Sequence, residues 1–234
     1  MEKQISRIVL DDFPFSIDKA KAMEICRVEE GSDEMELFNS VFETACSLVR
    51  PKAVIVVAGI EKTGEDTVLV DGVEIRSRMV RVNFEKIHRT FVFLATCGRE
   101  IDDWTHTLTE DILAQFYAEE IQKLALAEAY KYLEKTIVER FLGGKGKIST
   151  MNPGSLKEWP IQGQREVFKI IGDAQDLAGV TLTGTCLMLP AKSVSGLAFE
   201  DDSGHVNCAM CPRETCPNRR APYDAELYTK RFAT

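Results

Sequence analysis

The sequence lacks several features that would assign it to a broad class. No apolar run approaches the ~20 residues that a membrane-spanning helix needs. The opening residues, MEKQISRIVLDDF, contain no uninterrupted apolar segment of the signal-peptide kind. Basic residues are in the minority, because 29 Lys and Arg stand against 37 Asp and Glu. We therefore expect a cytoplasmic protein with neither a membrane nor a nucleic acid as partner, since such contacts need clustered positive charge.

Signatures of common enzyme classes are missing as well. The sequence contains no Walker loop, no G-x-G-x-x-G fingerprint and no evident Ser-His-Asp constellation. These absences argue against an independent hydrolase or nucleotide-dependent enzyme and leave open whether the chain is an enzyme at all. Its 234 residues are 44% apolar and 28% charged, which is ordinary for a folded protein with a sizeable core.

Apolar patterns predict a mixture of strands and helices. The predicted strands are 5–10, 53–60, a hairpin over 67–75, 91–98 and 180–189. The hairpin prediction depends on Asp71-Gly72, which suits a type I′ turn. The predicted helices are 16–31 with Ser16 as cap, 37–49, 107–143 with a Thr107/Glu110 capping box, and 165–174. Residues 144–160 are rich in Gly, Ser and Pro and are predicted to form a long irregular loop.

A run of small polar residues separates two apolar stretches late in the chain. The segment CLMLPAKSVSGLAFEDD (186–202) contains Lys192 followed by Ser193, Val194, Ser195 and Gly196. Small side chains let the backbone approach a ligand closely, and their hydroxyl and N–H groups can hold its polar atoms. The alternative is a plain hairpin loop, because Ser and Gly are ordinary turn residues.

Three features of the sequence resemble the activation (reactivation) domain of cobalamin-dependent methionine synthase. They are LALAEAYKYLE (124–134) in the long predicted helix, the loop containing Pro153-Gly154, and MLPAKSVSG (188–196). The resemblance is closest over 96–199, where TCG (96–98) and DDW (102–104) add to it. It implies an α+β fold, with a curved antiparallel sheet packed on long helices, over residues 1–206. Residues 207–234 are then a cysteine-containing C-terminal tail.

The resemblance also implies a function. In that family the domain binds S-adenosylmethionine and sits over the corrin. One electron from a donor such as flavodoxin, with the methyl group of S-adenosylmethionine, then converts inactive cob(II)alamin to methylcobalamin. This chain would be a stand-alone accessory protein that docks on the cobalamin module of a methionine synthase or another corrinoid protein. The expected ligand-binding residues are Glu128, Gly154, Lys192, Ser193, Val194, Ser195, Gly196 and Phe199.

The chain departs from the family pattern at its Arg-x-x-x-Gly-Tyr motif. The corresponding stretch, TMNPGS (150–155), keeps Gly154 but has Thr150 in place of Arg and Ser155 in place of Tyr. Loss of the Arg removes a bidentate partner for a ligand carboxylate. The candidates to replace it are Lys145, Lys147, Lys157 and Lys192. Glu128 is expected near the ligand's amine or sulfonium, the alternative being a solvent-facing helix carboxylate. Trp159 either stacks on a ligand or anchors the core.

Three of the seven cysteines are closely spaced near the C-terminal end. Cys208, Cys211 and Cys216 form a C-x₂-C-x₄-C arrangement that suits zinc or an iron–sulfur cluster, with His205 or Cys186 as candidate fourth ligand. A reduced or partly disulfide-linked tail is the alternative. The cysteines open two further functional hypotheses. One is a redox protein that passes electrons to a corrinoid enzyme without binding S-adenosylmethionine, and the other is a non-catalytic clamp with structural zinc.

Overall fold

The computed structural model describes residues 6–62, 64–201, 207–213, 215, 219 and 221–232. Its strands are β1 (Ser6–Leu10), β2 (Lys52–Lys62), β3 (Thr67–Val70), β4 (Val73–Arg76), β5 (Arg89–Thr96), β6 (Ile148–Met151), β7 (Thr181–Leu182), β8 (Met188–Leu189) and β9 (Ser193–Glu200). Its helices are α1 (Lys19–Cys26), α2 (Met35–Leu48), α3 (Arg78–Asn83), α4 (Arg99–Thr105), α5 (Ile112–Phe141), α6 (Gln164–Ile171), α7 (Ala174–Ala178) and α8 (Ala225–Phe232), with short 3₁₀ helices η1 (Ile161–Gly163) and η2 (Asn207–Met210).

The main sheet is antiparallel and has the strand order β4-β3-β2-β5-β9-β6. The long strand β2 pairs with β1 over Ala53–Val57 and with β3 over Ile60–Lys62. Its sequence and that of β5 are rich in β-branched and aromatic residues, which favour extended structure. The expected α+β fold with a curved antiparallel sheet and helices is confirmed.

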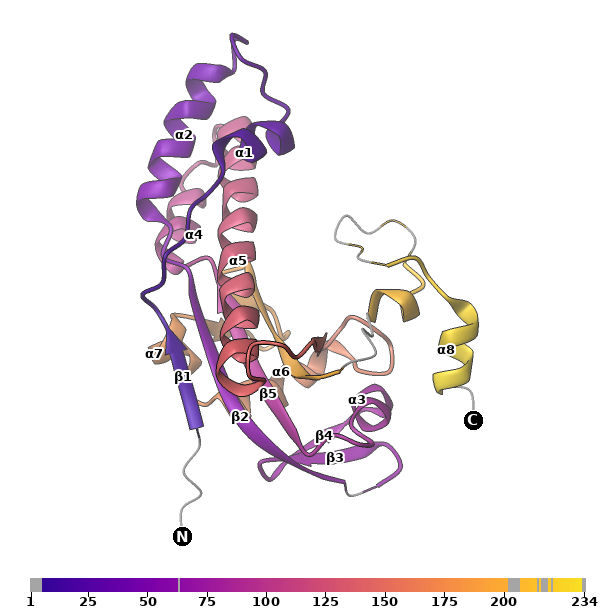
Figure 1. Ribbon diagram of the computed structural model, residues 1–234. Helices are drawn as coiled ribbons and strands as arrows, with labels where there is room; N and C mark the ends of the chain where they lie inside the picture. The colour runs from indigo at the N-terminus through magenta and orange to yellow at the C-terminus, as the bar shows by residue number, and fades with distance from the viewer. Residues whose placement is uncertain are drawn as a thin grey trace.

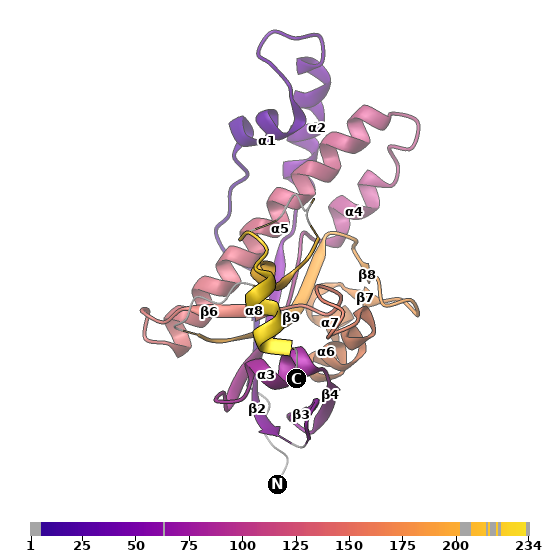
Figure 2. The ribbon, with the colours of Figure 1, turned by 90° about the vertical axis from the view of Figure 1, so that its right-hand side faces the viewer.

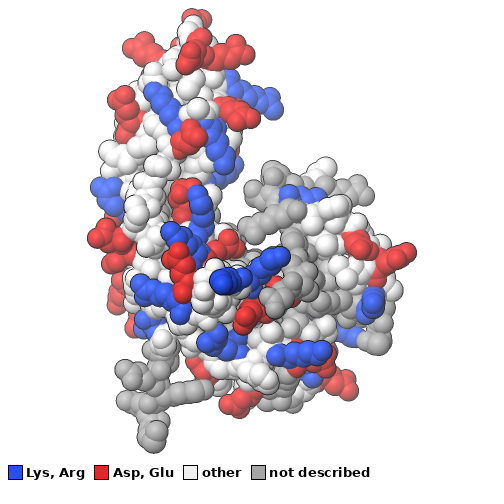
Figure 3. Space-filling model, in the orientation of Figure 1, with Lys and Arg blue, Asp and Glu red and all other residues white. Residues whose placement is uncertain are grey.

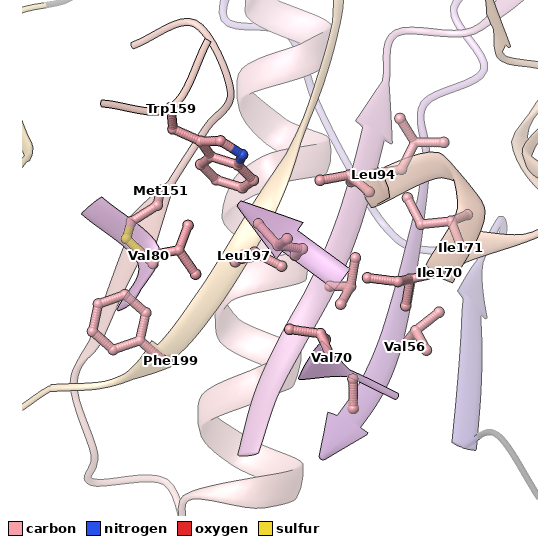
Figure 4. Packing of buried hydrophobic residues seen from close by; sticks show 14 of the residues in the cluster. Val56, Val70, Val80, Leu94, Met151, Trp159, Ile170, Ile171, Leu197 and Phe199 are labelled. Atoms are coloured by element: carbon pink, nitrogen blue, oxygen red, sulfur yellow. The ribbon is translucent and has the colours of Figure 1, made fainter. Parts of the chain in front are cut away.

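Helices cover both faces of this sheet (Figure 1). Because side chains alternate along a strand, Ile55 and Phe93 face α5, where they meet Leu133. On the opposite face, Val56 and Leu94 pack with Ile170 and Ile171 of α6, as Figure 4 shows. Burial on both faces explains why β2 and β5 have nearly continuous apolar sequences instead of alternating ones.

A helical arm extends beyond the sheet (Figures 1 and 2). We define the arm as residues 16–48 and 99–124, which include α1, α2, α4 and the first half of α5. Its own core contains Phe38, Val41, Tyr117 and Ile121. At 1.5 Å per residue, the 30 residues of α5 span roughly 45 Å. The first half of the helix packs against the other helices of the arm, and the second half packs on the sheet.

The predicted helix starts were wrong in two places. Helix α1 begins after Asp18, whose carboxylate accepts a hydrogen bond from the Lys21 N–H at 3.2 Å, and not after Ser16. Helix α5 begins after Asp111, which accepts from the Ala114 N–H at 2.9 Å. The Thr107 hydroxyl instead donates to the Trp104 carbonyl at 2.7 Å, at the end of the separate helix α4. Helix α1 ends at Cys26, and Arg27 caps it in the left-handed region with φ 56°.

Three segments have a different backbone structure from the predicted one. The predicted loop 144–160 contains β6, and the predicted strand 180–189 is a hairpin of β7 and β8 around a Thr183–Cys186 turn. Residues 193–196 form the start of strand β9 between β5 and β6, and not a loop. The pairings of β9 with β5 and β6 join residues far apart in the chain, which a local pattern cannot connect. The type I′ turn prediction is confirmed by Asp71 and Gly72, with φ of 46° and 80°.

Within the described residues, no helix combines the length and the apolar character that crossing a bilayer would require.

Candidate functional site

Strand β9 divides the Ser-Val-Ser-Gly motif between the two faces of the sheet. Ser195 lies opposite Leu94 of β5 and faces α6, where its hydroxyl donates a short hydrogen bond to Gln164 Oε1. Val194 packs in the cluster under α5, and Gly196 lies opposite Phe93 on that same face. The motif therefore cannot present all four residues to one ligand on one face.

The two serines of the motif are bound by the protein itself. Ser195 is 1% exposed, and its carbonyl accepts from Asn152 Nδ2 at 2.8 Å. Together with the bond to Gln164, this contact ties both ends of the 152–164 segment to β9. Ser193 Oγ lies 2.9 Å from Thr96 Oγ1 and 2.8 Å from the Pro190 carbonyl oxygen. Both serines therefore hold chain segments together.

Two glycines have different roles at this edge of the sheet. A Cβ on Gly196 would lie 2.2 Å from the Met151 carbonyl oxygen, so glycine permits the close approach of β6 to β9. Gly154 has φ +84° and is exposed, and its N–H donates to the Trp159 carbonyl at 2.8 Å. Trp159 is 1% exposed and packs near Met151 and Leu197 in the core (Figure 4), so it is a core anchor.

Thr150, which occupies the position of the family's arginine, lies on the α5 side of β6. Its Oγ1 accepts a hydrogen bond from the Tyr130 hydroxyl of α5 at 3.0 Å. The Tyr130 ring packs edge-on against Phe93, with centroids 5.6 Å apart. Tyr130 could not be singled out from the sequence, because it lies in the apolar pattern of the long helix and only the fold brings its hydroxyl to β6.

Among the strands that the structure describes, β6 is the last of the sheet, and one side of its backbone pairs with none of them. Exposed Gly154 and Ser155 follow it after Asn152 and Pro153. We call the group formed by Tyr130, Thr150, Asn152, Gly154 and Ser155 the β6 edge. It combines the exposed residues Gly154 and Ser155 with the partly buried polar side chains of Tyr130, Thr150 and Asn152.

Two of the predicted ligand-binding residues lie away from the β6 edge. Glu128 precedes Tyr130 by two positions, so the two side chains leave α5 about 200° apart. The Glu128 side chain is 33% exposed, and its Oε1 lies 3.8 Å from Lys131 Nζ. Phe199 is buried in the core on the α6 side, with its ring edge-on to Phe84 at 5.4 Å.

Lys192 is engaged by acidic residues of the arm. Its Nζ lies 3.2 Å from Glu119 Oε2 of α5, and its side chain is 22% exposed. Asp102 of α4 lies close by: burial raises the pKa of this carboxyl, while the charges of His106 and Lys192 and the Ala191 N–H oppose that rise. Lys145, Lys147 and Lys157 are exposed. Lys145 and Lys147 directly precede β6, whereas Lys157 Nζ lies 5.5 Å from the Tyr228 ring centre.

The C-terminal cysteines are described only in part. Cys216, His205 and the Cys208 side chain lie outside the described residues. Cys211 is half-buried, and its carbonyl accepts from Arg219 Nη2 at 3.0 Å. Met210 is fully buried in the domain core, so this part of the segment packs on the sheet domain. Among the residues that the structure describes, no three His, Cys, Asp or Glu side chains are grouped to hold a metal. The metal site stays a prediction.

Cys26 and Cys97 are buried core thiols. Burial raises the pKa of Cys97 to about 12 and that of Cys26 to about 11. Both side chains are therefore protonated at neutral pH, which makes them poor nucleophiles and poor metal ligands.

The sequence matches no protein family and no curated protein. Its structure is similar to the "Crystal Structure of the MetH Reactivation Domain bound to AdoHcy", with a TM-score of 0.61 and 14% sequence identity. The match covers 86% of this chain and 80% of that chain. The chain therefore has the fold of the MetH reactivation domain.

Proposed function

We propose that this protein binds S-adenosylmethionine and assists the reductive reactivation of a corrinoid enzyme such as cobalamin-dependent methionine synthase. The observation that carries the proposal is the fold shared with a reactivation domain whose structure holds AdoHcy, the demethylated form of S-adenosylmethionine. The proposed reaction transfers the methyl group of S-adenosylmethionine to a corrinoid held by the partner and leaves AdoHcy. One electron comes from an external donor such as a flavodoxin.

The β6 edge is the proposed ligand site. Its hydroxyl and backbone groups fit the neutral hydrogen-bonding parts of an adenosine, and the exposed backbone at Gly154 permits close approach. Lys145 and Lys147, exposed in the turn before β6, are the proposed partners of the ligand carboxylate in place of an arginine. Ser195 and Gly196 support the site without contacting the ligand. The Ser195 carbonyl binds Asn152, and Gly196 leaves room for Met151 to pack against β9.

The proposal is tested with a methionine synthase that lacks its own activation domain and is loaded with cob(II)alamin. This protein, S-adenosylmethionine and a reductant are added without oxygen, and the absorption change to methylcobalamin is followed. Conversion that requires both this protein and S-adenosylmethionine supports the proposal. If conversion fails and calorimetry shows no binding of S-adenosylmethionine or AdoHcy, the proposal is wrong.

A matched pair of tyrosine variants tests the site itself. Tyr130→Phe removes only the hydroxyl that meets Thr150, and we expect it to weaken binding of AdoHcy about tenfold, or ~1.4 kcal/mol. Tyr132→Phe is the control, because Tyr132 lies two positions further along α5 and points to another side of the helix. Its ring stacks on that of Phe13, with the ring centroids 4.5 Å apart. Equal affinities in the two variants would place the ligand elsewhere.

A second candidate function is a metal-dependent partner of a corrinoid protein that does not bind S-adenosylmethionine. It is favoured by the C-x₂-C-x₄-C spacing and by the anchoring of this segment through buried Met210. The metal in this candidate function is either an iron–sulfur cluster or zinc. The colour of protein purified without oxygen distinguishes the two, because an iron–sulfur protein is brown and a zinc protein is colourless. Metal content that is unchanged in Cys208→Ser/Cys211→Ser protein would exclude this site.

A further inference from the structure

The outer end of α5 presents apolar side chains to solvent. Ile112 is 80% exposed, Phe116 42% and Leu113 40%. Residues four and three positions apart lie on one side of a helix, so Phe116 is a neighbour of both Ile112 and Leu113. Isolated exposed apolar residues are common, but three within five positions on one helix face form a patch that calls for an explanation.

The arm that carries this patch holds the negative charge of the molecule. Residues 16–48 and 99–124 contain 15 acidic and 5 basic residues, a formal charge of −10. The rest of the chain contains 22 acidic and 24 basic residues, so the net charge of −8 comes from the arm alone. Figure 3 shows acidic side chains at the outer tip of the arm, whereas acidic and basic side chains are mixed further down the arm and over the body.

Two exposed carboxylates, Glu110 and Asp111, directly precede the patch in the chain. The Phe116 ring centre lies 5.9 Å from that of Tyr117, its neighbour on α5. Burial raises the pKa of the Tyr117 hydroxyl, and the negative charges of Glu34, Cys26 and Asp111 raise it further. Glu34 precedes α2 and Asp111 caps α5. The apolar surface is thus bordered by negative charge.

We propose that Ile112, Leu113 and Phe116, with the adjoining Glu110 and Asp111, form a docking surface for a protein partner that presents apolar side chains among Lys and Arg. The apolar side chains supply buried area and the carboxylates select the charge of the partner. A second copy docked arm to arm would bring like charges together, and nucleic acid or an anionic membrane would be repelled. This inference does not depend on ligand binding at the β6 edge.

The probe for this surface is a synthetic amphipathic helical peptide of about five turns, with Leu on one face and Lys on the other. The control peptide has Glu in place of every Lys. We expect fluorescence anisotropy to show binding of the Lys peptide only, with affinity falling about tenfold between about 50 and about 300 mM salt as the charges are screened. Equal binding of both peptides, or no binding of the Lys peptide, would overturn the proposal.

Two double variants with the same chemistry locate the binding surface. The first double variant, Ile112→Ser/Phe116→Ser, removes the patch. The second, Leu187→Ser/Leu189→Ser, is the control on the β7–β8 hairpin, where the two leucines are 61% and 48% exposed. We expect at least about a tenfold loss of affinity in the first variant and no change in the second, with circular dichroism unchanged in both. An equal effect of the two variants would contradict the proposal. Dimerisation of the unaltered protein that Ile112→Ser/Phe116→Ser abolishes would make a second copy the occupant and would also contradict it.

Discussion

Gly196 shows how a small residue in a ligand-like motif can be required by packing. The Met151 carbonyl oxygen and Asn152 Nδ2 occupy the space that a larger side chain would need, since a Cβ at this position would lie 2.2 and 2.8 Å from them. The neighbouring Ser195 is equally confined, because its hydroxyl and its carbonyl each meet a different segment. At these positions the small residues let β6 and the 152–164 segment close onto β9.

Substitution of Gly196 by Ala should separate β6 from β9. The Cβ would contact backbone, which cannot move without breaking strand pairing, so we expect the free energy of unfolding to fall by about 2–4 kcal/mol. Urea denaturation measures the change. The control is Gly184→Ala, since a Cβ there meets nothing within 4 Å and the change should stay within about 0.5 kcal/mol. Similar losses in the two variants would show that packing at β9 is not the cause.

Helix α8 contacts the domain through apolar side chains and through the polar group of Tyr228. The Tyr228 hydroxyl donates a short hydrogen bond to Glu158 Oε1, whose side chain is 9% exposed. In the described part of the chain, the other oxygen of that carboxylate, Oε2, is buried without a partner. The Glu158 carbonyl accepts from Ser77 Oγ at 2.8 Å, next to α3, and Figure 2 shows α8 over α3.

Tyr228→Phe should loosen α8 without unfolding the sheet. The substitution leaves the Glu158 carboxylate buried with one hydrogen bond fewer, which costs about 1–3 kcal/mol locally. Amide hydrogen exchange should therefore accelerate over 225–232 and stay unchanged in α5. Tyr223→Phe is the control, because Tyr223 is 41% exposed. Unchanged exchange in α8 after Tyr228→Phe would mean that apolar contacts alone hold the helix.

Across the molecule as a whole, charge is segregated between arm and body. The arm carries a formal −10 and the remainder +2. Like charges on one element repel each other, and salt screens exposed charges over about 8 Å at physiological ionic strength. The stability of the arm should therefore depend on salt more than that of the body.

Raising NaCl from about 20 to about 300 mM should increase the free energy of unfolding by about 1 kcal/mol, because screening relieves repulsion within the arm. Glu30→Lys/Asp33→Lys changes two exposed residues and reduces the arm charge from −10 to −6, so its salt dependence should be smaller. Thermal denaturation across the salt series measures both. If the free energy of unfolding depends on salt equally in the unaltered protein and in the double variant, repulsion in the arm does not limit stability.

Much of the fold could be predicted because its signals are local. The β-branched run in β2, the Asp71-Gly72 turn and the apolar spacing of α2 each identify an element within a short window. The N-terminal caps of α1 and α5 were less predictable, because each helix has two candidate caps close together. These are Ser16 and Asp18 for α1, and Thr107 and Asp111 for α5, where the packing of α4 on α5 decides the start of α5. The resemblance located the motif residues, but nothing in a linear pattern distinguished Tyr130.

Local patterns in the sequence were enough to specify most helices, strands and turns, and composition gave the overall excess of acidic residues. Tertiary contacts were needed to establish that Ser193–Gly196 is a strand, that Thr150 meets Tyr130, and that Glu128 leaves α5 on another side. The physical reason is that strand pairing and helix facing join residues far apart in the chain. A side chain's role then depends on which face it occupies, and alternation along β9 sends neighbouring motif residues to opposite sides.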